Sequence, residues 1–253
     1  MARLEAVLFQ RVLLILFFSL SLSASEIKVA VAANVSFAIN ELISAFNQKY
    51  PDVKVEVILG SSGKLNAQIK RGAPFDIFMS ANRAYPQDIF DKNLAIAPAK
   101  IYAQGLLAMF SEKPRDFSKG IYTLKNRDIS KIAIANPTTA PYGKATLEAL
   151  KNAKLYNTIK DKLVYAQSIS QTVQYALTAV DVAFIAKSSL FSSKMRRFKE
   201  GKNWTELDTK LYGAIKQGVV IIKSTKNLKA SREFYDFLFN KEAKKVFKKY
   251  GYL

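Results

Sequence analysis

The sequence predicts an α/β protein with two lobes, each a mainly parallel sheet flanked by helices, and a ligand cleft between the lobes. Strand-like and helix-like segments alternate along the chain, which is typical of parallel sheets. Two apolar runs, near 105–108 and 215–220, stand where the chain can cross between the lobes. The length of 253 residues and the 49% hydrophobic content suffice for packed cores. The predicted lobes are 25–106 with 218–253 (lobe 1) and 107–217 (lobe 2).

Lobe 1 begins with a regular order of strand and helix. Apolar runs predict strands at 27–33, 53–59 and 76–81. Apolar residues at helical spacing predict a helix after each strand, at 36–50, 63–72 and 86–92. Pro51 ends the first of these helices, and Gly72 closes the second.

The alternation of strands and helices continues through lobe 2, and the chain then returns to lobe 1. One long strand at 101–110 is predicted to make the first crossing. Lobe 2 is predicted to contain strands at 131–137, 163–166 and 182–186, with helices at 141–151 and 171–179. A strand at 214–223 leads back to lobe 1, and helices at 231–238 and 241–248 finish the chain.

Residues 1–24 predict a secretory signal peptide. Arg3 and Arg11 precede an unbroken apolar run, Val12–Phe18, which trails into small residues up to Ala24. The run is shorter than the roughly 20 apolar residues that a membrane span needs. The chain has no cysteine, so a lipid-anchored cysteine at the cleavage point is excluded. The mature protein is therefore predicted to be soluble and exported.

Composition narrows the class of function. The formal net charge of +19 favours anionic partners, either small anions or a polyanion. The lysines are spread in short groups rather than clustered, and an exported protein meets no genomic DNA, so nucleic acid is not a predicted partner. The chain has no His and no Cys, and its carboxylates show no paired spacing, so we predict that it is not an enzyme and needs no cofactor.

Four strand-to-helix turns carry the predicted ligand site. Ligands of open α/β sheets bind outside the carboxyl ends of the strands, where helices begin. The turns supply amides, hydroxyls and carboxamides without a carboxylate, at 32–36, 60–63, 136–143 and 168–173. Helix N-termini carry unpaired N–H donors and partial positive charge, so the set favours an anion. Taken singly, Asn34 and Ser62 are also good helix caps, and that structural role stays open for each.

Several stretches carry a resemblance to a known family. VAVAANVSFAINELISAF, GSSGKLNAQIKRGAPFDIFMSA, NPTTAPYGKATLEAL and FYDFLFNKEAKKVFKKYGY resemble the molybdate-binding proteins of ABC importers, which have the type II periplasmic binding-protein fold. The resemblance implies a periplasmic monomer that captures molybdate, and also tungstate, for a membrane permease. It implies that molybdenum arrives as the oxyanion, with no direct bond from protein to metal.

The resemblance also assigns residues. By position, Asn34, Ser62, Tyr142 and Val173 match the ligand-binding positions of the family. Val173 matches the main-chain donor that opens its helix, and Tyr142 matches another main-chain donor, to which its hydroxyl can add. Val35, Ser61 and Gly63 are additional candidates. The family often has a tyrosine where Ala186 stands, so one expected hydroxyl is missing here.

Two alternatives remain open at this point. Another small anion, such as sulfate or an organic anion, would suit the same fold and the same turns. A basic surface protein that binds polyanions would follow from the charge alone.

Overall fold

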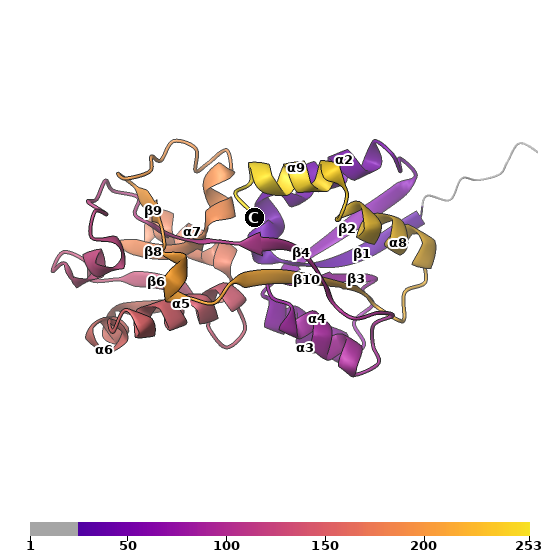
Figure 1. Ribbon diagram of the computed structural model, residues 1–253, viewed down its shortest axis with the longest axis horizontal. Coiled ribbons are helices and arrows are strands. Elements are labelled where there is room, and N and C mark those ends of the chain that lie inside the picture. Colours follow the sequence, from indigo (N-terminus) through magenta and orange to yellow (C-terminus); the bar gives the residue numbers. More distant parts are fainter. Residues whose placement is uncertain (1–24) are drawn as a thin grey trace, which may run out of the picture.

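The computed structural model describes residues 25–253, and the predicted signal peptide at 1–24 lies outside the described residues. Two mixed five-stranded sheets form the centres of two lobes that lie side by side (Figure 1). Sheet 1 has the order β2-β1-β3-β10-β4, with bounds Val53–Gly60, Ser25–Ala32, Ile77–Met79, Ile215–Ile221 and Lys100–Gly105. Sheet 2 has the order β7-β6-β8-β5-β9, with bounds Leu163–Ala166, Ile132–Ala135, Val182–Ala186, Leu107–Phe110 and Trp204–Glu206.

Each sheet is half parallel and half antiparallel. In sheet 1, β1 pairs in parallel with β2 and β3, whereas β10 pairs antiparallel with β3 and β4. In sheet 2, β6 pairs in parallel with β7 and β8, whereas β5 pairs antiparallel with β8 and β9. The sequence predicted mainly parallel sheets. The antiparallel pairs arise because β10 enters sheet 1 from lobe 2 and β5 enters sheet 2 from lobe 1. Each of these two strands runs opposite to the parallel strands of its sheet.

Helices cover both faces of sheet 1 (Figure 1). One face carries α3 (Ser62–Lys70) and α4 (Ala84–Asp91), which bury Leu65 and Ile89 against Ala30 and Phe78. The opposite face carries the helices α2 (Ile39–Asn47), α8 (Leu228–Phe237) and α9 (Lys241–Lys249). Their apolar sides form a second core around Phe46. This double cover fixes the turns at the ends of the strands, where the predicted site lies.

Sheet 2 is covered in the same way. The helices α5 (Pro141–Asn152) and α6 (Tyr156–Ile159) pack on one face, in a cluster that includes Leu150 and Ile159. The helix α7 (Ile169–Thr178) packs on the other face, where Ala176 meets Phe110 and Ile185. Short 3-10 helices, Ala33–Phe37 (η1), Gly120–Lys125, Lys160–Lys162, Lys187–Phe191 (η4) and Thr209–Leu211, connect the main elements.

The chain passes between the lobes near the predicted positions. The single strand predicted at 101–110 is broken at Leu106, so that β4 stays in sheet 1 and β5 enters sheet 2. The return strand β10 already pairs with β4 from Ile215, three residues before the predicted lobe boundary at 218. The division of the chain into lobes stays a prediction; below, lobe 1 and lobe 2 denote sheet 1 and sheet 2 with the helices packed on them.

The C-terminal tail is tied to the first crossing. Leu253 and Gln104 exchange main-chain hydrogen bonds, with both N···O distances at 2.9 Å. Gly251 lies against the Phe191 ring of η4, so the tail contacts both lobes. Across residues 25–253, no helix has the length and apolar character that a membrane crossing requires.

Candidate functional site

A small cavity lies where the two lobes meet. Its walls are the turns after β1, β2 and β3 and the starts of α5 and α7: Ala32, Ala33, Asn34, Gly60, Ser61, Ser62, Ala81, Ala140, Pro141, Tyr142 and Ile169. About 10 Å³ of the cavity is open to the centre of a water-sized sphere. This is roughly the space that one water molecule needs. The predicted residues Asn34, Ser61, Ser62 and Tyr142 therefore come together, although they are far apart in the sequence.

Lobe 1 contributes two buried hydroxyls at the start of α3. Ser61 is the N-cap residue and is only 5% exposed, yet its side chain makes no capping hydrogen bond. Its Oγ atom has no hydrogen-bond partner among residues 25–253. Ser62 is 1% exposed, and its Oγ accepts the Ala81 N–H at 3.0 Å. Since that bond uses a lone pair of Oγ, the Ser62 proton remains available for donation into the cavity.

Lobe 2 contributes helix starts rather than hydroxyls. Pro141 is the first residue of α5 and has no N–H, so the Tyr142 amide is the first donor of that helix. Ile169 is the first residue of α7, and Ser168 before it accepts the Gln171 N–H at 3.2 Å as a true cap. The N–H groups of the first turn have no partner inside a helix. The side chains here are mostly apolar, so the main chain is the polar part of this wall.

The cavity is neutral but electropositive. None of the residues that line it is charged. The partial positive charge of the α3, α5 and α7 N-termini is directed towards the same space. Such a site can hold a small anion by hydrogen-bond donors without a countercharge. It offers no carboxylate, so it has no strong acceptor for a protonated ligand.

The Asn34 side chain faces a buried network behind the cavity. Its Nδ2 donates to Gln217 Oε1 at 2.9 Å and to Tyr252 Oη at 3.0 Å. Tyr102 Oη donates to the same Gln217 oxygen at 2.9 Å, and Tyr252 Oη donates to the Asn34 carbonyl at 2.9 Å. Both N–H groups of the Asn34 carboxamide are therefore already used. The side chain holds the turn after β1 in place, and the main chain of that turn is what faces the cavity.

Three predicted residues lie outside the walls of the cavity. Val173 is the fifth residue of α7, not its first, and packs in the core with Ala176 and Phe110. An amide at that position belongs to the helical hydrogen-bond ladder, so the assignment of Val173 as the opening donor is corrected. The signal that identifies the true start is Ser168, which caps α7 and makes Ile169 the residue that the sequence analysis missed.

Gly63 and Val35, the other two predicted residues outside the cavity walls, make structural contacts instead. The Gly63 N–H donates to the Thr139 carbonyl at 2.8 Å, which joins lobe 1 to lobe 2. Val35 is fully buried in the core of lobe 1, between η1 and α2. Ala186 ends β8 and packs in the cluster that contains Tyr142 and Ala140. The capping role that stayed open for Asn34 and Ser62 is not seen, since neither side chain caps its helix.

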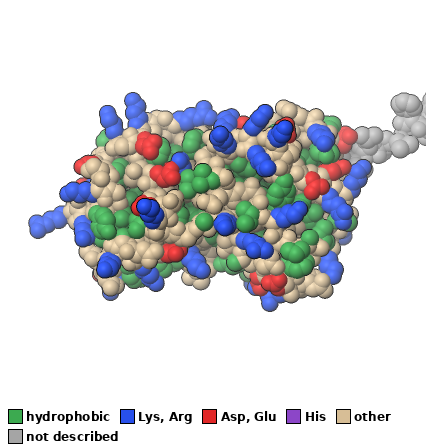
Figure 2. Space-filling model, in the orientation of Figure 1, with side chains coloured by type: hydrophobic (Ala, Val, Ile, Leu, Met, Phe, Trp, Pro, Cys, Tyr) green, Lys and Arg blue, Asp and Glu red, His purple; other side chains and the backbone are tan. Residues whose placement is uncertain are grey.

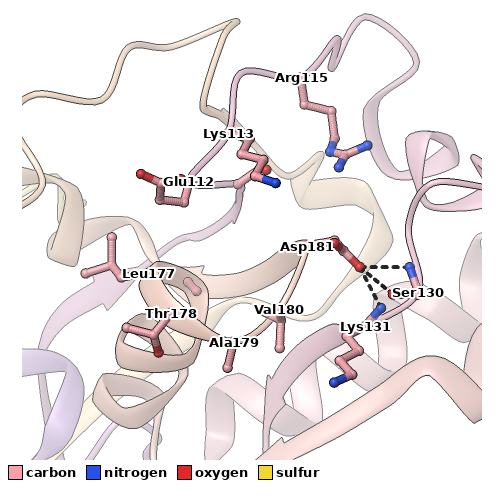
Figure 3. A pocket seen from close by; sticks show the side chains of 12 residues that line it. Glu112, Lys113, Arg115, Ser130, Lys131, Leu177, Thr178, Ala179, Val180 and Asp181 are labelled. Carbon is pink, nitrogen blue, oxygen red and sulfur yellow. Dashed lines mark hydrogen bonds between the residues drawn. The ribbon is translucent and has the colours of Figure 1, made fainter.

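A larger cavity, of about 370 Å³, lies at the other end of α7 and has a different character (Figure 3). Charges of both signs line it, among them Glu112, Arg115 and Asp181. Asp181 accepts from the Ser130 N–H, the Ser130 hydroxyl and the Lys131 N–H at 2.8, 2.9 and 2.9 Å. The helix presents its carbonyl end here, which is unfavourable for an anion. The cavity between the lobes is therefore the better candidate.

Basic side chains are scattered over the face of the molecule drawn in Figure 2. Figure 2 shows Lys and Arg spread over both lobes, with Asp and Glu among them. Ion pairs such as Lys54–Glu26 and Lys249–Glu41 offset part of the positive charge locally. A polyanion-binding surface would gather its cations in one patch or stripe, so this distribution argues for general attraction of anions.

Comparisons with known proteins agree with this geometry. A model of the family described as bacterial extracellular solute-binding protein matches residues 27–253. The molybdate-binding protein ModA of Rhodobacter capsulatus is 34% identical over 242 residues, covering 95% of this chain and 93% of the relative. ModA of Azotobacter vinelandii is 33% identical over 231 residues, covering 90% of each chain. The solved structure of the periplasmic molybdate-binding protein of Azotobacter vinelandii superimposes with a TM-score of 0.82 at 28% identity, covering 90% of this chain and 98% of that one.

Proposed function

The chain belongs to the bacterial extracellular solute-binding protein family as a ModA-like member, and from this premise we propose that it captures molybdate, and also tungstate, for the permease of an ABC importer. Membership of a solute-binding family confirms the prediction that the protein is not an enzyme. It also places the protein outside the cytoplasm. We assign it to the periplasm, where it acts as a monomer.

The observation that carries the proposal is the convergence of neutral donors on one small cavity. The Ser61 and Ser62 hydroxyls approach from lobe 1, and the starts of α5 and α7 approach from lobe 2. Each hydrogen bond to a charged ligand contributes roughly 1.5–3 kcal/mol. Molybdate and tungstate carry no proton at neutral pH, so donors without a carboxylate suit them. The proposed ligands are the two hydroxyls and the main-chain N–H groups of Asn34, Tyr142 and Ile169.

Contacts between the lobes support a closed conformation around the ligand. Besides the bond from Gly63 to Thr139, the Lys64 Nζ donates to Gln167 Oε1 at 3.1 Å. Ser188 Oγ donates to the Asn34 carbonyl at 3.0 Å. All these contacts would break if the lobes separated about the crossings. We therefore propose that a hinge movement admits the anion and that closure buries it, as in other two-lobed binding proteins.

Calorimetric titration of residues 25–253 with molybdate, tungstate and sulfate tests the proposal. We expect one-to-one binding of the first two anions and weaker binding of sulfate. The matched variants are Ser62→Ala, which removes a cavity hydroxyl, and Ser118→Ala, which removes an exposed one. Only Ser62→Ala should weaken binding.

The other outcomes identify the alternatives. Binding of sulfate alone would keep the fold and change the ligand. Binding of an organic anion alone would likewise keep the fold and change the ligand. The protein could bind neither metal oxyanion and instead bind heparin in a salt-sensitive way that Ser62→Ala does not change. That result would replace the proposal with a polyanion-binding surface.

A further inference from the structure

The Tyr142 hydroxyl lies against the first crossing, at Gly105. The side chain is 1% exposed, although the residue begins a helix that faces the cavity. A Cβ atom on Gly105 would lie 2.0 Å from Tyr142 Oη and 2.9 Å from its Cζ. Any side chain at residue 105 would therefore expel the phenol from its place. The missing Cβ of Gly105 makes room for Tyr142.

Three complementary polar atoms meet behind the cavity. Tyr142 Oη, Asn34 Oδ1 and Gln217 Nε2 are buried, and none has a hydrogen-bond partner within residues 25–253. The Cβ position on residue 105 is also only 2.9 Å from Gln217 Nε2, so this donor lies beside the phenol. An amide N–H donates, a carboxamide oxygen accepts, and a phenol does both. Gln217 can therefore donate to Tyr142, and Tyr142 can donate to Asn34.

The three atoms come from both sides of the cleft. Tyr142 belongs to α5 of lobe 2, whereas Asn34 follows β1 of lobe 1. Gln217 lies in the return strand β10, where the register with β4 shifts between Gln217 and Gly218. A chain of hydrogen bonds through these residues would link α5 of lobe 2 to the turn after β1 of lobe 1. Opening would remove Tyr142 from partners that are themselves buried.

The phenol is suited to this role in its protonated form. Burial raises the pKa of Tyr142 well above its usual value, and the neighbouring Tyr252, Tyr102 and Tyr212 act in the same direction. The hydroxyl therefore remains a donor at every pH at which the protein would work.

We propose that Tyr142 is a positioning residue that latches the anion-bound closed form, with its hydroxyl bridging Gln217 Nε2 and Asn34 Oδ1 when the anion is in the cavity. The inference rests on the proposed function and adds a second role to a residue whose main-chain N–H faces the ligand. The latch fixes the Asn34 turn from behind and slows release of the anion. It also explains the need for glycine at residue 105.

The alternative is that the hydroxyl is merely unsatisfied. A buried hydroxyl without a partner destabilises the folded state, so its removal would leave binding unchanged and raise the melting temperature. If the hydroxyl is a latch, its removal weakens anion binding. Tyr142→Phe keeps the ring and the main-chain N–H, so it separates the two cases.

The experiment measures molybdate affinity by calorimetry, the change in radius of gyration on adding molybdate by X-ray scattering, and the melting temperature without ligand. For a latch, Tyr142→Phe weakens molybdate binding about tenfold, since one to two hydrogen bonds are lost. The melting temperature without ligand does not fall. Tyr122→Phe, at a tyrosine that is 49% exposed on the same lobe, should bind like the wild type.

Gly105→Ala provides an independent test from the other side of the contact. It should weaken binding at least as much as Tyr142→Phe and reduce the contraction that molybdate causes. The double variant should bind no worse than Gly105→Ala, because removal of the hydroxyl removes the tightest contact, the one at 2.0 Å. Wild-type affinity in Tyr142→Phe, or additive losses in the double variant, overturn the latch. Failure of the wild-type protein to bind molybdate or tungstate removes the proposed function, and the latch with it.

Discussion

The two lobes have the same strand topology but build their halves of the cleft from different chemistry. The orders β2-β1-β3-β10-β4 and β7-β6-β8-β5-β9 correspond strand for strand, with the parallel strands in the same places. Each lobe also places an aspartate just before its third parallel strand. Asp76 accepts the Lys28 N–H at 2.6 Å, and Asp181 accepts the Lys131 N–H at 2.9 Å. In both lobes, therefore, an aspartate side chain accepts a main-chain hydrogen bond from the neighbouring strand segment.

At the cleft the lobes diverge. Lobe 1 presents the Ser61 and Ser62 hydroxyls, whereas lobe 2 presents helix starts lined by Ala140, Pro141 and Ile169. A side-chain donor can be removed by one substitution. A main-chain donor can be removed only by proline or by moving the backbone. If the cavity is the binding site, the lobe 1 hydroxyls depend on residue identity, and the lobe 2 donors depend on how closely the backbone packs.

The largest loss of stability and binding is expected from Gly143→Ala, which disrupts the packing of α5 on sheet 2. A Cβ at residue 143 would lie 2.0 Å from the Ala135 carbonyl oxygen, at the end of β6. Moving α5 away should cost at least about 1–3 kcal/mol of unfolding free energy and abolish tight anion binding. Urea denaturation and calorimetry measure the two losses. The matched control in lobe 1 is Gly60→Ala, which meets only the flexible Leu65 side chain at 3.1 Å and should unfold almost like the wild type.

A smaller loss, confined to binding, is expected from Ser62→Ala in lobe 1. Loss of one hydrogen bond to the dianion should weaken molybdate binding by about 10- to 150-fold, corresponding to roughly 1.5–3 kcal/mol. The Ala81 N–H also loses its acceptor, so a modest drop in melting temperature should accompany the change. Equal affinities of Ser62→Ala and wild type in calorimetry would exclude the Ser62 hydroxyl as a ligand.

The main-chain character of lobe 2 is tested by Ile169→Pro against Ile169→Ala. Proline is accepted at the first position of a helix, and Ser168 before it is already extended, with φ −148° and ψ 164°. The proline variant should keep the helix and lose the N–H, weakening molybdate binding about tenfold or more relative to the alanine variant. Alanine keeps the N–H and reports the lost packing alone. Similar affinities of the two variants would exclude this amide as a ligand.

The smallest effect concerns stability against pH in lobe 2. Burial opposes ionisation of Asp181, but donors from Lys131 and Ser130 hold the pKa of its carboxyl below the usual value. A lowered folded-state pKa gives stability that is present above the unfolded pKa and is lost as the pH falls through the folded pKa. Asp181→Asn should therefore be less stable than wild type at about pH 7, and the gap should close towards about pH 3. Urea midpoints at both pH values measure it, with the exposed Asp161→Asn as control. A gap that persists in acid would attribute the loss to geometry rather than to charge.

The sequence was sufficient for what is local. Runs such as 27–33 and 53–59 alternate with helical patterns, so the fold class and most elements followed from periodicity. The same reasoning placed Asn34, Ser61, Ser62 and Tyr142 at strand ends, and the structure brings them to one cavity. These residues come together because the carboxyl ends of parallel strands meet at one edge of a sheet, and their part in binding stays a prediction.

Most of what failed depended on contacts between distant segments. The start of α7 is an exception, because Ser168 marks it locally and it was predicted two residues too late, at 171. Val173 was matched to the opening donor by the resemblance, in place of Ile169. The Gly63 amide is used by Thr139, a contact that exists only once the lobes have met. The direction of the Tyr142 hydroxyl depends on the absence of a side chain at residue 105. No periodic pattern reports either contact.

The insertion of β10 between β3 and β4 has a consequence for the order of folding. All strands of sheet 2 lie between Leu107 and Glu206, in one continuous stretch. Sheet 1 is complete only when residues 215–221 are available, since Met79 of β3 pairs with Val219 of β10. Contacts at such long sequence separation form slowly. The lobe that begins the chain is therefore the one expected to finish folding last, after the ribosome has made almost the entire protein.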